Sequence, residues 1–489
     1  MLFNSIDFAI FLPIVFGLYW FVINRNLKHQ NMLILVASLV FYGWWDWRFL
    51  SLLLLSSFVD FFVGLKVYKH NPVKKRRMIL LISLIFNIGL LGFFKYYNFF
   101  VDSFVNAFTF FGHSIPKRNL NIILPVGISF YTFQTLSYSI DIYRRKLKPT
   151  KDLVAFLAFV SFFPQLVAGP IERASNLLPQ FHKKRVFNYT AAADGLRQML
   201  WGLFKKVVVA DNLSKLVEPI FDNTSQFSSY TLLLGLAMFS VQIYADFSGY
   251  SDIAIGTGRL FGFNLKINFR YPLFARSIGE RWRNWHISLS TWFRDYIYIP
   301  MGGSRGSKWN KFKNVVILFT ISGFWHGANW TFVFWGLANG LLFAPSMLLN
   351  KNRTHLEPIS KKKLIPNLKE GFQMFTTFWL IAFTYMFFRA DNLSHSRSYF
   401  NGIINNVNLP SLNSGIMNEY GLLITDIYKA LIFVLMMLFV EWSNRDKEHG
   451  LYFSENNKQP LFRWGIYILI TFIIFWWAGD QETFIYFQF

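Results

Sequence analysis

The sequence predicts an all-α, polytopic integral membrane protein, with roughly ten or more transmembrane helices plus re-entrant or interfacial helices around a central tunnel or funnel. Composition is the first reason, because hydrophobic residues make up 53% of the 489-residue chain and charged residues only 15%, unlike a soluble protein. The second is a series of apolar stretches close to the 20 or so residues that cross a bilayer. The third is a polar middle, Ile253–Asn314, between apolar segments, which indicates backbone buried in protein or beside water.

The amino-terminal part is expected to form four apolar helices. Their stretches are Phe8–Asn24, Met32–Trp45, Phe49–Leu65 and Met78–Phe94. The only charge within them is Asp60. No basic start precedes the first stretch and no small-residue cleavage site follows it, so a retained helix is predicted rather than a signal peptide.

The formal charge of +23 is explained by topology rather than by nucleic acid, because many lysines and arginines lie in short loops between apolar segments. By the positive-inside rule five basic segments are cytoplasmic: Arg25–Lys28, Lys69 with Lys74–Arg77, Arg144–Lys151, Lys351–Lys369 and Arg445–Lys458. The amino terminus, the carboxyl terminus and three further segments then fall on the opposite face: Trp44–Arg48, Asn98–Asn121 and the polar loop Asp391–Asp426.

Some chemistries are excluded or unsupported. The chain has no cysteine, which excludes cysteine nucleophiles, disulfides and thiolate metal sites. No ligand spacing suggests a bound metal or other prosthetic group.

Four segments carry polar side chains where a membrane interior is expected, and such side chains indicate function by default. They are "PVGISFYTFQTLSYSIDIYR" from Pro125, "FFPQLVAGPIER" from Phe162, "QIYADFSGYSDIAIG" from Gln242 and "ERWRNWHISLSTWFRDYIYIP" from Glu280. Three of their residues are candidate tunnel-lining or supporting groups: Gln134, Asp246 and Ser248.

Structural explanations compete with function for several of these residues. Asp246 and Asp252 would pair with arginines such as Arg281 or Arg283 and hold helices together. Gly249 and Gly327 fit helix packing better than catalysis. Three tryptophans are expected to be interfacial anchors: Trp282, Trp285 and Trp292.

His326 is the most informative residue, because it lies well inside the uncharged run Val315–Leu349. That run would be about 50 Å long as one helix, too long for a single untilted crossing. It must break or tilt, which would place the imidazole at or beside a helix end. A natural position for the break is marked by Ser322, Gly323, Gly327 and Asn329. A buried histidine by itself is more often a hydrogen-bonded core residue than a catalytic one.

The four polar segments and "GFWHGANWTFVFWG" from Gly323, in this order, closely resemble the membrane-bound O-acyltransferase (MBOAT) family. More narrowly, they resemble its bacterial branch of alginate O-acetylation and teichoic acid D-alanyl transfer membrane proteins. By this resemblance His326 matches the family's catalytic histidine and His286 its second characteristic polar position. The resemblance implies three segments: amino-terminal transmembrane helices in 1–121, a catalytic core in 122–349, and a basic linker with carboxyl-terminal transmembrane helices in 350–489.

The chemistry agrees with what the resemblance implies. Transfer of an acyl group from a thioester to a hydroxyl needs a base, and a neutral imidazole suits that role, so His326 is the predicted general base. Burial would keep it neutral. Donors for the oxyanion are sought among His286, Asn284, Trp325 and Asn329. A covalent route remains open, because His286 and Ser290 would share one face of a helix.

The expected enzyme binds no cofactor and uses an acyl-thioester co-substrate, acetyl-CoA or an acyl carrier protein. The acyl group is expected to be acetyl. Its partners would be the lipid bilayer, a polysaccharide or other hydroxyl acceptor, and an extracytoplasmic acyltransferase, with the chain in a bacterial cytoplasmic membrane. Two other classes stay open: a transporter or channel with a histidine-containing pathway, and a non-catalytic scaffold of a polysaccharide-modifying complex.

Overall fold

The computed structural model describes residues 1–111, 116, 119–167, 169–357, 359, 365–408, 424–453 and 460–487. These residues form helices and no strand, as the fold class requires. They group into two compact units, Met1–Gly195 with Thr257–Lys266, and Leu196–Gly256 with Ile267–Phe489. The division predicted at residues 121 and 349 follows the sequence resemblance, whereas these units are defined by compactness. The predicted division therefore stays a prediction.

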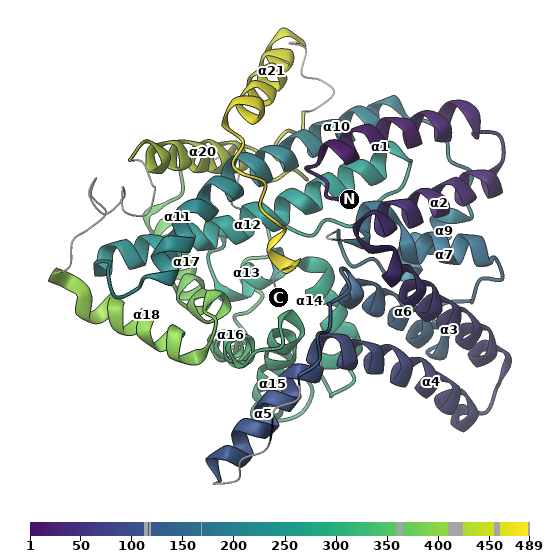
Figure 1. Cartoon of the computed structure of the whole chain (residues 1–489), viewed down its shortest axis with the longest axis horizontal. Helices are drawn as coiled ribbons and strands as arrows, with labels where there is room; N and C mark the ends of the chain where they lie inside the picture. The colour runs from purple at the N-terminus through teal and green to yellow at the C-terminus, as the bar shows by residue number, and fades with distance from the viewer. Residues whose placement is uncertain are drawn as a thin grey trace. The chain divides into compact units, whose positions relative to one another are not determined.

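The first unit holds α1 to α9 and the start of α10 (Figure 1). The four apolar stretches predicted at the amino terminus are helical, which confirms those predictions. The bounds are α1 (Ile6–Gly17), α2 (Leu27–Asp46), α3 (Leu50–Lys69), α4 (Val73–Leu91), α5 (Tyr97–Phe110), α6 (Ile128–Tyr143), α7 (Leu153–Ser161), α8 (Phe163–Leu166), α9 (Ala174–Phe181) and α10 (Tyr189–Leu203). Short π-helical turns continue α1 over Leu18–Val22 and join α4 to α5 over Gly92–Tyr96.

The charge inside the third apolar stretch is accommodated by hydrogen bonds rather than by an ion pair. Asp60 of α3 is fully buried and accepts hydrogen bonds from Ser83 and Asn87 of α4 and from Ser139 of α6. Because a buried carboxyl without partners is costly, these three donors explain part of the polarity of α4 and α6. The polar side chains near Asp60 are therefore structural.

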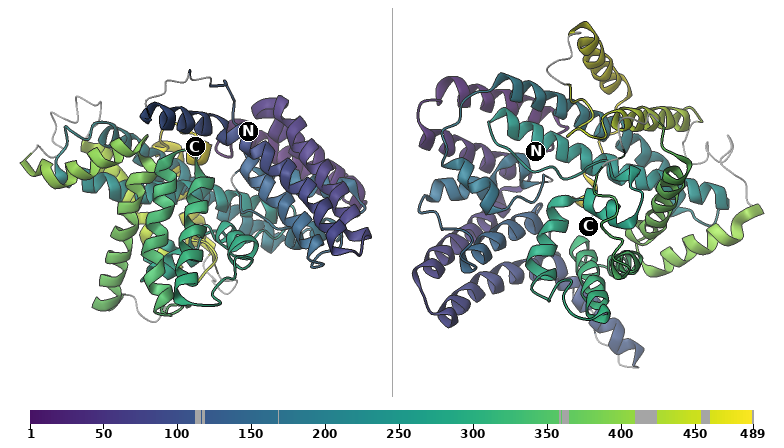
Figure 2. Two further views of the ribbon diagram at one scale, coloured as in Figure 1. Left: turned by 90° about the horizontal axis from the view of Figure 1, so that it is seen from below. Right: turned by 180° about the vertical axis from the view of Figure 1, so that it is seen from behind.

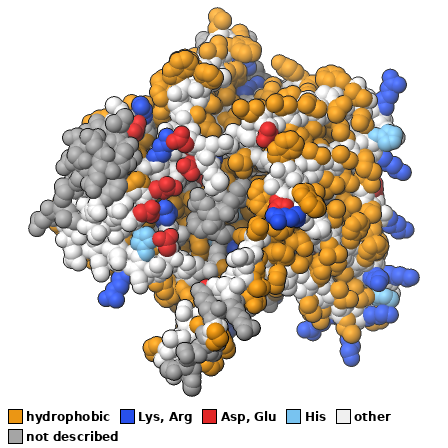
Figure 3. Space-filling model, viewed as in Figure 1, with side chains coloured by type: hydrophobic (Ala, Val, Ile, Leu, Met, Phe, Trp, Pro, Cys, Tyr) orange, Lys and Arg blue, Asp and Glu red, His pale blue; other side chains and the backbone are white. Residues whose placement is uncertain are grey.

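The predicted cytoplasmic loops of this unit lie at one end of its helices. Arg145 donates hydrogen bonds to the backbone carbonyls of Tyr68 and His70, at 2.8 and 2.9 Å, which joins the loop after α6 to the loop after α3. Figure 3 shows lysine and arginine side chains along one edge of the molecule, where the α1–α2 and α3–α4 connections lie in Figure 1. Apolar side chains cover the surface next to that edge.

Two predicted polar loops are partly helical, so the predictions of loop structure were wrong there. The segment Asn98–Asn121 contains most of α5, in which Phe100, Phe104 and Phe108 recur every fourth residue and are exposed on one face. Asp391–Asp426 contains α18. Sequence polarity hid both helices, because an amphipathic surface helix is polar on one side. Residues 112–115, 117–118 and 409–423 of these segments lie outside the described residues.

The second unit holds the remaining helices and most of the polar middle Ile253–Asn314, of which Thr257–Lys266 belongs to the first unit. Its helices are α11 (Asp211–Asp222), α12 (Ser229–Leu260, up to Gly256 in this unit), α13 (Ile278–Asn284), α14 (Ile287–Phe293), α15 (Lys308–His326), α16 (Trp330–Leu348), α17 (Leu368–Arg389), α18 (Leu393–Asn405), α20 (Ile424–Ser443) and α21 (Pro460–Trp477). The π-helical turn Phe204–Ala210 joins α10 to α11. In Figure 2 the green helices of residues 308–389 run side by side.

Among the residues that the structure describes, six helical segments are long and apolar enough to cross a membrane by length and composition. They are Leu27–Lys69, Val73–Phe110, Ser229–Leu260, Trp330–Leu348, Leu368–Arg389 and Pro460–Trp477. The first of them joins α2 and α3, which are 20 residues each, so it is long enough for two crossings. The shorter apolar helices Ile6–Val22 and Leu153–Leu166 add to this set.

Candidate active site

His326 lies at the end of α15, where the sequence predicted a helix break. The helix ends at His326, three residues leave helical geometry, and α16 begins at Trp330. Asn329 caps the new helix, its side-chain oxygen accepting a hydrogen bond from the backbone N–H of Thr331 at 3.1 Å. The predicted break and the position of the imidazole beside a helix end are confirmed.

Glycines bring the backbones of α15 and α16 together. A Cβ atom on Gly323 would lie 2.2 Å from the carbonyl oxygen of Phe332, and one on Gly336 would lie 2.3 Å from that of Phe319. A Cβ on Gly327 would lie 2.1 Å from the Phe332 ring. The packing role predicted for Gly327 is thus confirmed, and this contact fixes where α15 ends.

Replacing Gly323 with alanine should push α15 away from α16 and displace His326. We expect a loss of about 1–3 kcal/mol in stability together with a lower rate of catalysis. Thermal unfolding in detergent and an activity assay measure the two effects. Gly371→Ala in α17 is the matched control, because a Cβ there meets no atom within 4 Å and alanine is the better helix former. Equal melting temperatures for the two variants would contradict the packing argument.

The His326 side chain is buried, 3% exposed, in an aromatic setting. Its ring centroid lies 5.0 Å from that of Trp335, 5.6 Å from Phe388 and 5.3 Å from Tyr486. Tyr486 comes from the carboxyl-terminal segment. These rings surround the imidazole and account for its burial.

His286 lies in the connection between α13 and α14, in a backbone conformation that non-glycine residues rarely adopt. Its φ of 43° and ψ of 55° are left-handed, and such strain is often retained at functional sites. The conformation is supported by Asn268, whose backbone carbonyl accepts from the N–H of Ile287 at 2.9 Å. The side-chain oxygen of Asn268 accepts from Ser288.

The hydrogen bond between His286 and the same amide oxygen of Asn268 indicates which ring nitrogen of His286 is protonated. Nδ1 of His286 lies 3.1 Å from Oδ1 of Asn268, while the amide nitrogen of Asn268 donates to Ser251. Nδ1 therefore carries the proton. Nε2 is buried and has no hydrogen-bond partner among the described residues. Burial lowers the pKa of His286 to about 3, so the ring is neutral and Nε2 is a free acceptor.

The two histidines line one cavity of about 450 Å³. Trp325 and Tyr486 contact both imidazoles: their ring centroids lie 6.2 and 6.4 Å from His286, and 5.0 and 5.3 Å from His326. Apolar side chains form much of the remaining wall, whereas Arg283 and Arg353 bring positive charge to it. A buried pair of imidazoles beside an accessible cavity can move a proton at a bound substrate.

Comparison with known proteins identifies the family. Residues 144–387 match the membrane-bound O-acyltransferase family, MBOAT. The probable alginate O-acetylase AlgI of Pseudomonas aeruginosa is 38% identical over 80% of this chain and 73% of its own length. This chain belongs to the MBOAT family. The predicted enzyme class, an acyltransferase, is thereby confirmed.

Two further relatives of this acyltransferase are named for other activities. The peptidoglycan O-acetyltransferase of Helicobacter pylori is 33% identical over 100% of this chain and 98% of its own length. The teichoic acid D-alanyltransferase of Streptococcus thermophilus is 28% identical over 54% of this chain and 68% of its own length.

The predicted supporting residues of the acyltransferase are only partly brought together. Trp325 contacts both histidine rings, and Ser290 lines the cavity. The Ser290 hydroxyl donates to the carbonyl of Trp285 rather than to His286, and His286 precedes α14 instead of sharing its face. Asn284 does not line the cavity. Asn329 also donates to the carbonyl of Asp391, away from the cavity.

The ion-pair partners predicted for the two aspartates of α12 were wrong. Asp246 pairs with Lys206 at 2.9 Å and Asp252 with Lys205 at 2.6 Å, not with arginines. Ser248 accepts a hydrogen bond from Lys205 at 2.9 Å. These three residues support the helices around the site and do not line its cavity.

Gln134 belongs to the first unit, where its amide donates to the carbonyl of Phe159 at 2.8 Å. This bond gives Gln134 a structural role within that unit.

The tryptophans of the same region are core residues rather than interfacial anchors. Trp285 and Trp292 are buried, and the Trp282 ring packs 5.0 Å from Phe319. The guanidinium of Arg281 lies 4.1 Å from the centroid of the Trp285 ring. Sequence reasoning also missed Tyr486, because nothing in a carboxyl-terminal tyrosine indicates which residues it meets.

Proposed function

We propose that this acyltransferase moves an acetyl group from a cytoplasmic thioester to a hydroxyl of a cell-surface or exported polysaccharide. The observation that carries the proposal is the shared cavity of His286 and His326 in a chain that is 38% and 33% identical to relatives named as O-acetylating enzymes. Thioester donors of the acetyl-CoA or acyl carrier protein type are compatible with the positive charge at the cavity wall.

His326 acts as general base in the proposed reaction. It accepts the proton of the hydroxyl as the hydroxyl oxygen attacks the thioester carbonyl, which gives a tetrahedral oxyanion. The carbon–sulfur bond then breaks, and the thiolate takes the proton back from the imidazolium, so that atoms and charge balance. His286 contributes a second buried acceptor that orients the hydroxyl. Trp325, beside both rings, is the candidate that remains for stabilising the oxyanion.

Substitution of Tyr486 tests whether the acyl group is bound covalently to the enzyme during transfer. The Tyr486 ring contacts both histidines, whereas the Ser290 hydroxyl donates to the carbonyl of Trp285. A covalent route through the Tyr486 hydroxyl predicts that Tyr486→Phe lowers acyl transfer by at least about tenfold, whereas the direct transfer proposed above predicts near-normal rates, since the phenylalanine keeps the ring contacts and loses only the hydroxyl. Steady-state rates measure the loss, and Ser290→Ala is the control with near-normal rates.

Intact-protein mass spectrometry after incubation with donor alone completes this test. An acyl adduct that disappears in Tyr486→Phe would assign a covalent route. Full turnover by Tyr486→Phe without any adduct would contradict a role for this hydroxyl and leave direct transfer between the two substrates.

The proposed location is a bacterial cytoplasmic membrane, with both termini on the extracytoplasmic side. The distribution of basic loops supports this orientation. Arg145 joins two of these loops by hydrogen bonds to the carbonyls of Tyr68 and His70, which supports their lying on the same side of the membrane. The acceptor would then be reached from outside, directly or through a separate extracytoplasmic acyltransferase that receives the acetyl group.

Labelling of an acceptor tests the proposal against its alternatives. Purified protein in liposomes, given a radiolabelled acetyl thioester, should transfer label to polysaccharide or partner protein. Flux that does not depend on acyl donor would instead indicate a transporter. A scaffold would give neither signal, and polysaccharide acetylation in cells would survive loss of both histidines.

A further inference from the structure

The connection between α16 and α17 forms a strap over part of the second unit, residues 351–357. This strap follows α16 directly, the backbone N–H of Lys351 donating to the carbonyl of Ser346 at 2.7 Å. It passes close to α13, because a Cβ on Gly279 would lie 2.8 Å from the carbonyl oxygen of Asn352. The strap therefore has a defined position rather than that of a free linker.

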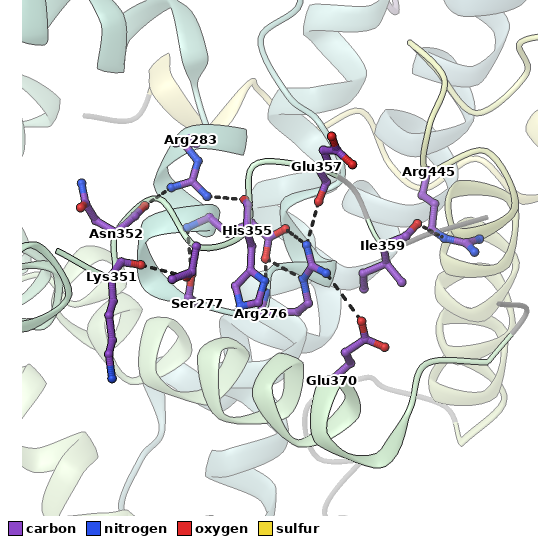
Figure 4. Close-up of polar contacts among 12 residues, drawn as sticks. Arg276, Ser277, Arg283, Lys351, Asn352, His355, Glu357, Ile359, Glu370 and Arg445 are labelled. Carbon is purple, nitrogen blue, oxygen red and sulfur yellow. Dashed lines mark hydrogen bonds and ion pairs between the residues drawn. The ribbon is translucent and has the colours of Figure 1, made fainter. Parts of the chain in front are cut away.

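Arginines from other elements hold the strap and its continuation by their backbone carbonyls (Figure 4). Arg283 of α13 donates to the carbonyls of Asn352 and His355. Arg276 donates to the carbonyl of Glu357 at 2.8 Å, and Arg445 to that of Ile359 at 3.1 Å. Because the anchors bind the backbone, the side chains of the strap remain available for other contacts.

Two strap residues, Asn352 and Arg353, line the cavity that also holds His286 and His326. Arg353 is exposed, so the cavity reaches the surface at this point. Arg353 forms no ion pair with any residue that the structure describes. The strap thus presents an uncompensated cation at the entrance of the catalytic cavity.

Positive charge accumulates at this entrance. Arg276 is compensated by Glu280 at 2.8 Å and Glu370 at 3.7 Å, whereas Arg283 donates hydrogen bonds to the backbone carbonyls of Asn352 and His355. Burial lowers the pKa of Arg283; the charge of Glu280 opposes this shift, whereas the charges of Arg353 and Arg276 add to it. A bound anion would relieve this repulsion, and a guanidinium is well suited to hold a phosphate.

We propose that Arg353, presented by the strap beside Arg283, binds a phosphate of the acyl donor and so positions its thioester in the cavity. This inference rests on the proposed function. The shared chemistry is a phosphopantetheine arm, which both coenzyme A and a carrier protein would supply. The phosphate stays at the basic entrance while the arm extends along the apolar wall towards the histidines.

Donor kinetics with full-length protein in detergent test the proposal. Arg353→Gln should raise KM for acetyl-CoA by about tenfold or more, the loss of one charged hydrogen bond, with kcat within about twofold. S-acetylpantetheine, which lacks phosphate, should react equally with both proteins. Lys351→Gln is the matched control, because its side chain points away from the arginine cluster (Figure 4). The same measurements are repeated with an acetyl-loaded acyl carrier protein as the second donor.

The outcomes separate the sources of the phosphate. If KM rises for acetyl-CoA alone, Arg353 binds a phosphate of free coenzyme A. If KM rises for the acetyl-loaded carrier protein alone, Arg353 binds the phosphate of the carrier-bound phosphopantetheine. An unchanged KM for both donors, or an equal loss with S-acetylpantetheine, overturns the proposal.

A binding measurement is independent of turnover. The thioether analogue of acetyl-CoA should bind Arg353→Gln about tenfold more weakly than wild type, with a smaller dependence on salt. Equal affinities of the two proteins would overturn the assignment of Arg353. Binding without any acyl transfer by wild type would overturn the proposed function and leave this phosphate site intact.

Discussion

Acyl transfer should fall by about 10²–10⁴-fold when His326 is replaced by alanine, the usual contribution of a positioned general base. The residue ends α15 inside the aromatic cluster and lines the cavity. Rates of acetyl transfer from thioester to acceptor measure the effect. Exogenous imidazole should restore part of the activity, because the cavity of about 450 Å³ has room for it.

The control for this variant is His70→Ala. His70 is a loop residue at the end of α3, and its removal should leave both activity and melting temperature unchanged. The melting temperature of His326→Ala should stay close to that of wild type, which separates lost chemistry from lost folding. Wild-type turnover by His326→Ala would exclude the proposed base.

Replacing Lys206 with methionine should destabilise the second unit by about 3–5 kcal/mol. Lys206 is buried between Asp211 at 2.8 Å and Asp246 at 2.9 Å. Without the ammonium, two carboxylates remain buried with no opposite charge between them. Asp246 also accepts a hydrogen bond from the backbone N–H of Ile485 at 2.8 Å, so the segment that carries Tyr486 should loosen as well. Thermal unfolding in detergent measures the loss.

Neutralising the carboxylates distinguishes the charge from the shape of this cluster. The triple variant Lys206→Met, Asp211→Asn, Asp246→Asn should recover most of the lost stability, because an uncompensated charge no longer remains. Lys215→Met removes a lysine whose pair with Asp480 is exposed, and should have no measurable effect. A Lys206→Met protein as stable as wild type would show that both carboxyl groups are neutral in the native state.

Sequence patterns predicted the helices and the break that places His326. Apolar stretches of the right length marked α1 to α4, and the excess length of Val315–Leu349 required an interruption, which the structure has after His326. These features depend on local composition and helix geometry, so they can be worked out without knowing what packs against what. The resemblance to the MBOAT family named the two histidines that meet in one cavity.

Other parts of the site could not be predicted in this way. The lysines that neutralise Asp246 and Asp252 come from the turn between α10 and α11, and Tyr486 comes from the end of the chain. Ser290 was expected to face His286, but the left-handed backbone of His286 removes it from the helix. In each case the sequence identifies a residue with suitable chemistry. Which residue it contacts depends on how distant segments of the chain pack together.

The sequence by itself determined the membrane class, the helical stretches, the interrupted span and the family, because hydropathy and helix length act along the chain. Only the tertiary structure decided that two histidines share a cavity and contact the ring of Tyr486, that lysines compensate buried aspartates, and that Arg353 lies at the entrance. Those arrangements depend on the close approach of helices, permitted by glycines such as Gly323, and on hydrogen bonds that form only after distant segments meet.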